Sequence, residues 1–158
     1  MALDKKLKTF KQFVEGKKKQ DWADYTIQWR LDVSNIQQLI INKWFNNLEK
    51  EKLASFNIIP VVRYEEYLGE YSITTLEIVF PNYKTIIMEP IAGIVIGDSD
   101  GKVDMYLQGS IKEKVVLLRK LKTNSKNPDW TIVKQYNGKE QLAFNKTNVE
   151  KIIEEWIQ

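Results

Sequence analysis

The sequence predicts an α+β fold, in which helices pack on a curved antiparallel β-sheet of about six to eight strands. Apolar residues recur at helical spacing before residue 55, short runs rich in β-branched and aromatic residues follow to residue 145, and a helical pattern returns at the end. The links between the runs are short, which favours antiparallel neighbours over helical crossovers. The 158 residues are expected to form a single domain, with a mainly helical part over 1–55, the sheet over 56–145 and a C-terminal helix over 146–158.

The first helix is expected over residues 3–15. Leu3, Leu7, Phe10 and Val14 follow one another at spacings of three and four residues, with lysines between them. This spacing places the apolar side chains on one face of an amphipathic helix.

Residues 20–31 fit two patterns. Apolar and polar residues alternate in the second half of this segment, as in a strand, whereas Trp22, Tyr25 and Trp29 also share one helical face. A pair of adjacent β-branched residues favours the extended conformation, and an extended segment is what we expect here.

The second helix is expected to begin at Ser34. Ser34 and Gln37 have the spacing of a capping box, in which side chains satisfy backbone N–H groups at the start of a helix. An apolar stripe then recurs at every fourth residue from Ile36 to Leu48, and the helical pattern fades near Ser55.

The central part of the chain is expected to form the sheet. Asn137-Gly138 favours a tight hairpin because both residues tolerate positive φ, and Phe80–Tyr83 has the composition of another turn. Pro60 fits the start of a strand or a sheet edge, since proline has no N–H to donate to a neighbouring strand. The predicted strands lie near 57–66, 72–80, 84–89, 92–97, 102–108, 114–121, 130–136 and 140–144.

The last helix is predicted by a second capping box, Thr147–Glu150, with Thr147 as its N-cap. Val149, Ile152, Ile153 and Trp156 then form one apolar stripe that should face the core.

The chain contains no histidine and no cysteine. Histidine is the commonest general base near neutral pH, both residues are common ligands of transition metals, and cysteine is the usual thiol nucleophile. We therefore expect a non-catalytic protein without a cofactor. The absence of disulfides fits the cytoplasm, no apolar run is long enough to span a bilayer, and the abundance of lysine, isoleucine and asparagine suggests a bacterial protein.

Charge is distributed unevenly along the sequence. Residues 1–20 carry seven lysines and two acidic residues, residues 61–104 carry eight acidic and three basic residues, and residues 111–151 carry ten basic and four acidic residues. A fold that keeps these segments on different faces would be dipolar, and such surfaces speed and orient encounters with charged partners.

The acidic segment also carries closely spaced tyrosines, which supply rigid contact area at protein interfaces. We therefore predict a non-catalytic protein-binding module, such as an inhibitor, an immunity-type protein or an assembly accessory protein, whose protein partner has a basic surface. The predicted contact residues are Tyr64, Glu66, Tyr67, Glu70 and Tyr71.

The first alternative is a nucleic-acid-associated accessory protein. Phosphate binding needs several converging basic side chains. The chain has only 3 arginines against 21 lysines, and this balance argues against base-specific recognition, for which arginine provides the bidentate contacts. The candidate residues are Lys17, Lys18, Lys19, Lys112, Lys114, Arg119, Lys120 and Lys122.

The second alternative is a carboxylate- or metal-dependent hydrolase. Asp98, Asp100 and Asp104 could supply oxygen ligands to Ca²⁺ or Mg²⁺, and Glu65 and Glu66 could supply acid–base groups. The spacing around the three aspartates does not match an EF-hand loop, and the same segment fits a plain hairpin turn.

Overall fold

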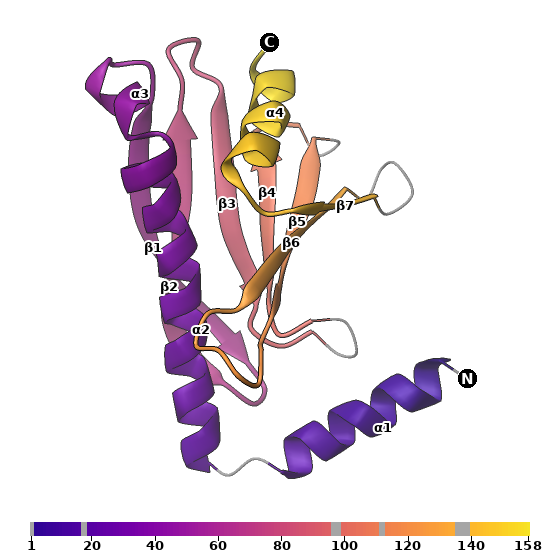
Figure 1. Cartoon of the computed structure of the whole chain (residues 1–158). Helices are drawn as coiled ribbons and strands as arrows, with labels where there is room; N and C mark the ends of the chain where they lie inside the picture. Colours follow the sequence, from indigo (N-terminus) through magenta and orange to yellow (C-terminus); the bar gives the residue numbers. More distant parts are fainter. Residues whose placement is uncertain (1, 17–18, 96–98, 111–112, 135–139) are drawn as a thin grey trace.

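The computed structural model describes residues 2–16, 19–95, 99–110, 113–134 and 140–158 (Figure 1). Its strands form one seven-stranded antiparallel sheet in which each strand pairs with its neighbours in sequence. Helices precede and follow the sheet, so the predicted α+β class is confirmed. The elements are α1 (Ala2–Glu15), α2 (Lys19–Leu39), the π-helix η1 (Ile40–Trp44), α3 (Asn46–Lys50), β1 (Ser55–Glu65), β2 (Gly69–Val79), β3 (Thr85–Ala92), β4 (Lys102–Leu107), β5 (Lys114–Lys120), β6 (Asp129–Lys134), β7 (Glu140–Ala143) and α4 (Lys146–Ile157).

The long helix α2 and the C-terminal helix α4 pack on one face of the sheet (Figure 1). The apolar stripe of α4 is buried as predicted, and it shares a core with Val33 of α2, Ile40 of η1, and Met88 and Leu117 of the sheet. Among the described residues, no helix has both the length and the apolar character that crossing a membrane requires.

The extended conformation expected for residues 20–31 is wrong, because these residues belong to α2. Tyr25, Trp29, Val33 and Ile36 are all buried at spacings of four and three, which is one face of a continuous helix. Burial of two large aromatic rings on this face outweighs the modest preference of β-branched residues for extended backbone.

The predicted helix start at Ser34 is wrong for the same reason, since Ser34 lies inside α2. Gln37 does not cap a helix. Its side chain is buried and bonds to β2, where its amide donates to the Thr74 carbonyl at 2.7 Å and its oxygen accepts from the Thr74 hydroxyl at 2.6 Å. In α4 the N-cap is Asn145, two residues before the predicted Thr147, and its side chain accepts from the Asn148 backbone N–H.

The strand expected over 92–97 is also wrong in its described part, residues 92–95, and residues 96 and 97 lie outside the described residues. β3 runs to Ala92, where its register with β4 shifts between Pro90 and Ala92, and beyond it Val95 makes only an isolated bridge to Ser99. The turn at Phe80–Tyr83 is confirmed by the hydrogen bond from the Tyr83 N–H to the Phe80 carbonyl. The Asn137-Gly138 turn lies outside the described residues, although β6 and β7 on either side of it pair antiparallel as expected.

Two glycines allow Trp29 to sit against the ends of β3 and β4. A Cβ atom added to Gly93 would lie 2.9 Å from the Trp29 ring, and one added to Gly101 would lie 2.4 Å from it. Real Cβ atoms do not approach other atoms so closely, so this packing of the indole depends on the missing side chains.

We expect Gly101→Ala to lower the free energy of unfolding by about 1–3 kcal/mol, because the new methyl group would overlap the buried Trp29 ring. Gly109→Ala is the matched control, since Gly109 also has a positive φ (84°) but no atom within 4 Å of its added Cβ. Urea unfolding measures both. Equal losses in the two variants would contradict the packing explanation.

Candidate protein-binding face

The register of the β1–β2 hairpin divides the predicted contact residues between two faces. Tyr64 pairs with Glu70, and Arg63 pairs with Tyr71, without interruption along the hairpin. Directly opposite residues of an antiparallel pair point to the same face, and neighbours along a strand point to opposite faces. Tyr64 and Glu70 therefore lie together, and Tyr71 points the other way.

The face that carries Tyr64 is open to solvent and apolar. Tyr64 is 77% exposed and Val62 is 62% exposed, and both lie on β1. Ile27 and Leu31 of α2 are 54% and 51% exposed. A groove of about 510 Å³ runs between α2 and the hairpin. We call this surface the hairpin face and define it as Ile27, Arg30, Leu31, Pro60, Val62, Tyr64, Glu70 and Ser72.

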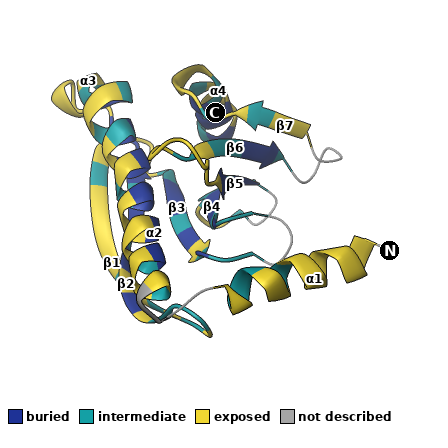
Figure 2. Cartoon of the chain, turned by 60° about the horizontal axis from the view of Figure 1, so that its bottom comes forward, coloured by how far each residue is buried: buried dark blue, intermediate teal, exposed yellow. Residues whose placement is uncertain are grey.

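The hairpin face borders a free strand edge. In the part of the chain that the structure describes, β1 is an edge strand of 11 residues that pairs only with β2 (Figure 2). Such an edge presents unpaired backbone N–H and C=O groups to which another strand can bond. Pro60 lies within this edge strand, which is one of the two positions that its lack of an N–H favours.

The opposite face of the hairpin is an internal polar junction. Tyr71 is buried (7% exposed), its hydroxyl accepts from Trp29 Nε1 at 3.2 Å, and it donates to the Glu65 carboxylate. Glu65 also accepts from the backbone N–H groups of Gly93 (3.0 Å) and Ile94 (3.4 Å). Burial, aided by the Glu65 carboxylate, raises the pKa of Tyr71. The Tyr71 side chain therefore anchors the hairpin inside the molecule and does not reach the predicted contact strip.

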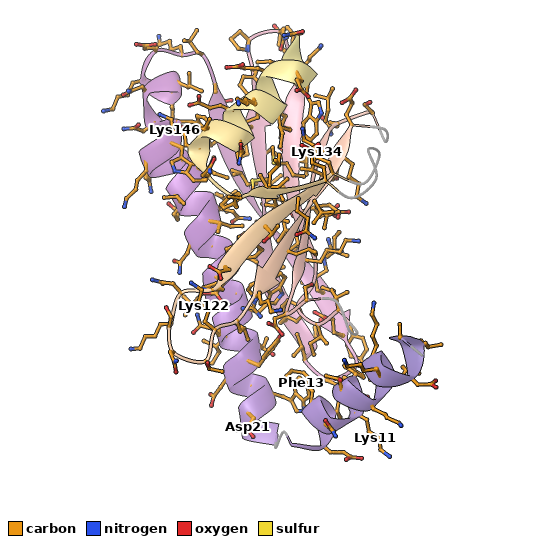
Figure 3. The ribbon with its side chains drawn as sticks, turned by 45° about the vertical axis from the view of Figure 1, so that its right-hand side comes forward. Lys11, Phe13, Asp21, Lys122, Lys134 and Lys146 are labelled. Atoms are coloured by element: carbon orange, nitrogen blue, oxygen red, sulfur yellow. The ribbon has the colours of Figure 1, made fainter. Side chains whose placement is uncertain are left out.

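The loop residues of the hairpin differ in the same way. Glu66 is exposed, next to the hairpin face, whereas Tyr67 is half-buried. The Tyr67 ring stacks on Trp22 at 5.4 Å and meets the edge of Phe10 at 5.7 Å. Phe13 points from α1 toward the same end of the molecule and lies 5.4 Å from the Trp22 ring (Figure 3). Tyr67 thus takes part in holding α1 against α2.

Arg119 was a candidate for nucleic-acid binding, but its side chain is fully buried. Its Nη1 lies 2.7 Å from Asp32 Oδ2, and its Nε donates to the Asp100 backbone oxygen at 2.8 Å. The guanidinium also lies 4.9 Å from the centre of the Trp29 ring and 5.3 Å from that of Tyr25. One side chain of β5 thereby joins α2 to the segment before β4, and it is shielded from any phosphate.

The remaining candidate lysines do not converge on one described surface. Lys17, Lys18 and Lys112 lie outside the described residues, and only the backbone of Lys19, at the start of α2, is described. Figure 3 shows basic residues such as Lys11, Lys122 and Lys146 spread along the length of the molecule. Of the other candidates, Lys114 pairs with Asp104 at 2.9 Å, Lys122 pairs with Asp129 at 2.9 Å, and Lys120 is exposed.

The aspartates proposed as metal ligands have other partners. Asp98 lies outside the described residues. Asp100 Oδ2 accepts from the Leu121 N–H at 2.8 Å, and Asp104, on β4, lies between Lys102 (4.0 Å) and Lys114. Within the described ranges, no group of three or more acidic side chains could hold a metal ion.

Glu65 and Glu66, the two residues predicted as acid–base groups of a hydrolase, also lie in different environments. Glu65 is held by the Tyr71 hydroxyl and two backbone N–H groups, whereas Glu66 is exposed.

No family model, curated protein or solved structure matches this chain.

Ile27, Leu31 and Val62 of the hairpin face were not among the contact residues predicted from the sequence. The signal for Val62 was its spacing of two from Tyr64 on a predicted strand. Ile27 and Leu31 are four residues apart and would share a helical face, but the strand expected over 20–31 concealed this relation.

Removing one partner of the buried Arg119–Asp32 ion pair should destabilise the protein. We expect Arg119→Met to lower the free energy of unfolding by about 3–5 kcal/mol, because the buried Asp32 side chain would be left without its partner. Adding Asp32→Leu should restore much of the loss, since two apolar groups of similar volume can replace a buried pair. Thermal and urea unfolding of both variants measure this. A double variant less stable than Arg119→Met would contradict the explanation.

The hydroxyl of Tyr25 should make stability depend on alkaline pH. It donates to the backbone oxygens of Gly93 (2.6 Å) and Asp100 (3.0 Å), and burial raises the pKa of Tyr25 from 10.0 to about 12. A folded pKa above the unfolded value means that this stabilisation is complete below pH 10 and is lost as the pH rises toward 12.

Tyr25→Phe should therefore be less stable than the wild type at pH 8 but lose less stability above pH 10. We expect the wild type to lose about 1–3 kcal/mol more than this variant between the two pKa values, as measured by urea unfolding at a series of pH values. Tyr83→Phe, which removes a phenol that is 89% exposed, is the control. Parallel pH profiles for Tyr25→Phe and the control would refute the assignment.

Proposed function

We propose that this chain is a non-catalytic protein-binding module that receives its partner on the hairpin face. The observation that carries the proposal is the exposure of four large apolar side chains: Ile27 and Leu31 line the groove, and Val62 and Tyr64 lie on the free edge strand, where Val62 pairs with the groove residue Ser72. Contiguous exposed apolar surface is rare on proteins that act alone and is typical of interaction sites.

The chemistry of the face favours an extended partner segment with both apolar and basic residues. Backbone bonding to the edge of β1 would supply affinity, and alternate side chains of the segment would enter the groove. Glu66 and Glu70 are exposed beside Tyr64, so a basic side chain of the partner would find acidic groups there. Inhibitors, immunity-type proteins and assembly accessory proteins all act through such contacts without chemistry of their own.

The composition of the chain supports a binding role over catalysis. A sequence without histidine and cysteine lacks the side chains that most often act as base, nucleophile or transition-metal ligand. Binding through apolar, tyrosine and carboxylate groups requires none of them.

We expect Val62→Ser and Tyr64→Ser each to weaken partner capture by about tenfold or more, as hot-spot residues at the centre of an interface do. The measurement is a quantitative pull-down with tagged protein from nuclease-treated lysate of the source organism, read by mass spectrometry. Ile59→Ser is the matched control, because Ile59 lies on the same edge strand, is 37% exposed and points to the other face. A partner captured equally by all variants would show that the face is elsewhere, and recovery lost on nuclease treatment would favour the nucleic-acid alternative.

A further inference from the structure

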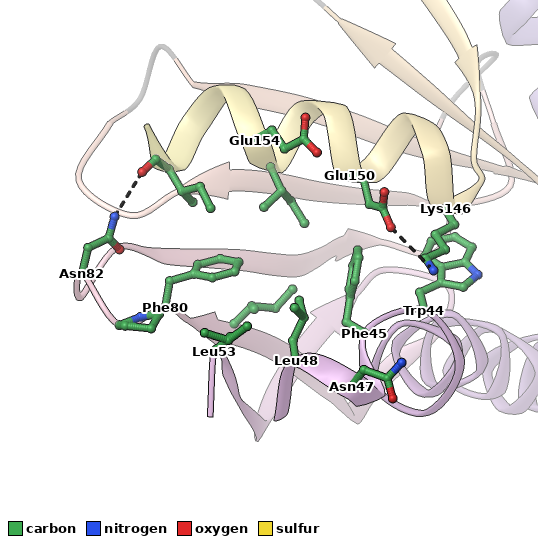
Figure 4. A pocket seen from close by; sticks show the side chains of 14 residues that line it. Trp44, Phe45, Asn47, Leu48, Leu53, Phe80, Asn82, Lys146, Glu150 and Glu154 are labelled. Carbon is green, nitrogen blue, oxygen red and sulfur yellow. Dashed lines mark hydrogen bonds and ion pairs between the residues drawn. The ribbon is translucent and has the colours of Figure 1, made fainter. Parts of the chain in front are cut away.

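A second open cavity, of about 580 Å³, lies between η1, α3, the end of β2 and α4 (Figure 4). It shares no lining residue with the hairpin face. Its volume lies within the range usual for sites that bind small molecules. The apolar walls include Trp44, Phe45, Leu48, Phe80, Ile153 and Ile157.

The cavity exists because α2 does not continue as a regular helix. At η1 the Phe45 N–H donates to the Ile40 carbonyl at 2.9 Å, a five-residue step, and this π-turn inserts one extra residue into the helix. The short helix α3 then ends at Lys50, and Lys52 just beyond it has a positive φ of 60°. The N–H of Leu53 returns to the Leu48 carbonyl at 2.7 Å, which fixes both leucines at the cavity wall.

The inner wall of the cavity is part of the core. Phe45, Ile78, Phe80 and Ile153 line it, and each is less than 9% exposed. Buried side chains of this kind are held by close packing on their other sides. The cavity is therefore preformed, and a ligand would not have to order the walls when it binds.

The polar groups at the rim are satisfied or face water. Lys146 and Glu150 pair with each other at 3.6 Å (Figure 4), and the Asn82 amide donates to the Ile157 carbonyl at 3.1 Å. Glu154 is exposed. Since no charged side chain of the described lining is buried, a charged ligand would lose hydration inside the cavity without gaining a partner.

We propose that this cavity binds an uncharged small molecule with a hydrocarbon body, of which a medium-chain alcohol is the simplest representative. The hydrocarbon contacts the ring of Phe80 and the side chains of Leu48 and Ile153, and the polar end stays at the rim near Asn82. This binding is independent of the hairpin face and of any protein partner.

The test is titration of the full chain with 1-hexanol, 1-octanol and 1-decanol by isothermal calorimetry. We expect one site per chain and an affinity that rises about fourfold for each added methylene group, the factor that corresponds to the burial of one methylene. Decanedioate, which carries a charge at both ends of the chain, should bind about tenfold more weakly than the alcohol or not at all, because one of its charges would have to enter the apolar cavity.

Leu53→Trp should reduce decanol binding about tenfold or more, because Leu53 lies at the mouth and a larger ring there would close it. Leu121→Trp is the matched control, since Leu121 is also a partly exposed leucine (38%) but lies outside the cavity. Leu53→Glu, which places a charge at the mouth instead of volume, should weaken binding as well.

Absence of saturable alcohol binding to the wild type would overturn the proposal. So would an affinity independent of chain length, or equal decanol binding by Leu53→Trp and Leu121→Trp. Sedimentation velocity completes the test: if decanol binds only while it dissociates a dimer, the natural occupant is a second copy of the chain and the proposal fails.

Discussion

The buried ion pair between Arg119 and Asp32 is the constraint on which one end of this molecule depends. Two charges are tolerated in a core only where neighbouring groups replace the lost water. Gln28 donates to the second oxygen of Asp32 at 2.7 Å, and the Asp100 carbonyl accepts from Arg119. Arg119 Nη2 has no hydrogen-bond partner among the described residues, but the guanidinium lies over aromatic rings, which attract a cation. These contacts join α2 to β5 and hold Trp29 of α2 in place, and Trp29 in turn donates to Tyr71 of the hairpin.

The two proposed binding regions lie where regular structure has to change. The hairpin face arises where the first part of β2 separates from β3. Residues 69–75 of β2 pair only with β1, and residues 76–79 pair with β3 as well. Burial changes phase at this point, from Tyr71 and Ile73 to Leu76 and Ile78. The cavity arises at the other end, where α2 passes into a π-turn. In both places the apolar side chains are positioned by the core but not covered by it.

Local patterns predicted most of the strands and turns because strand alternation and turn composition act over a few residues. Pro60 at the edge and the turn before Tyr83 are examples. The failures came where a distant residue decides. Apolar and polar residues alternate over Tyr25–Leu31 as in a strand. The segment is helical because Trp29 packs on the sheet, which this local pattern does not reveal. Likewise, Tyr64 and Tyr71 are the same type of residue in the same acidic segment. Tyr64 is exposed and Tyr71 is buried because the hairpin register places them on opposite faces. The cavity depends on a π-turn that no pattern in the sequence announced.

The order of the strands in the sheet is also the order of their synthesis. Each hairpin can pair as soon as its second strand has left the ribosome, without waiting for a distant segment, and such local contacts favour fast folding. The packing of α2 depends on more distant contacts, and the Arg119 partner of Asp32 is 87 residues away. Until β5 emerges, docking of α2 in its final position would bury the Asp32 carboxylate without its partner, which is costly. We therefore expect α2 to complete its docking only after β5 has left the ribosome.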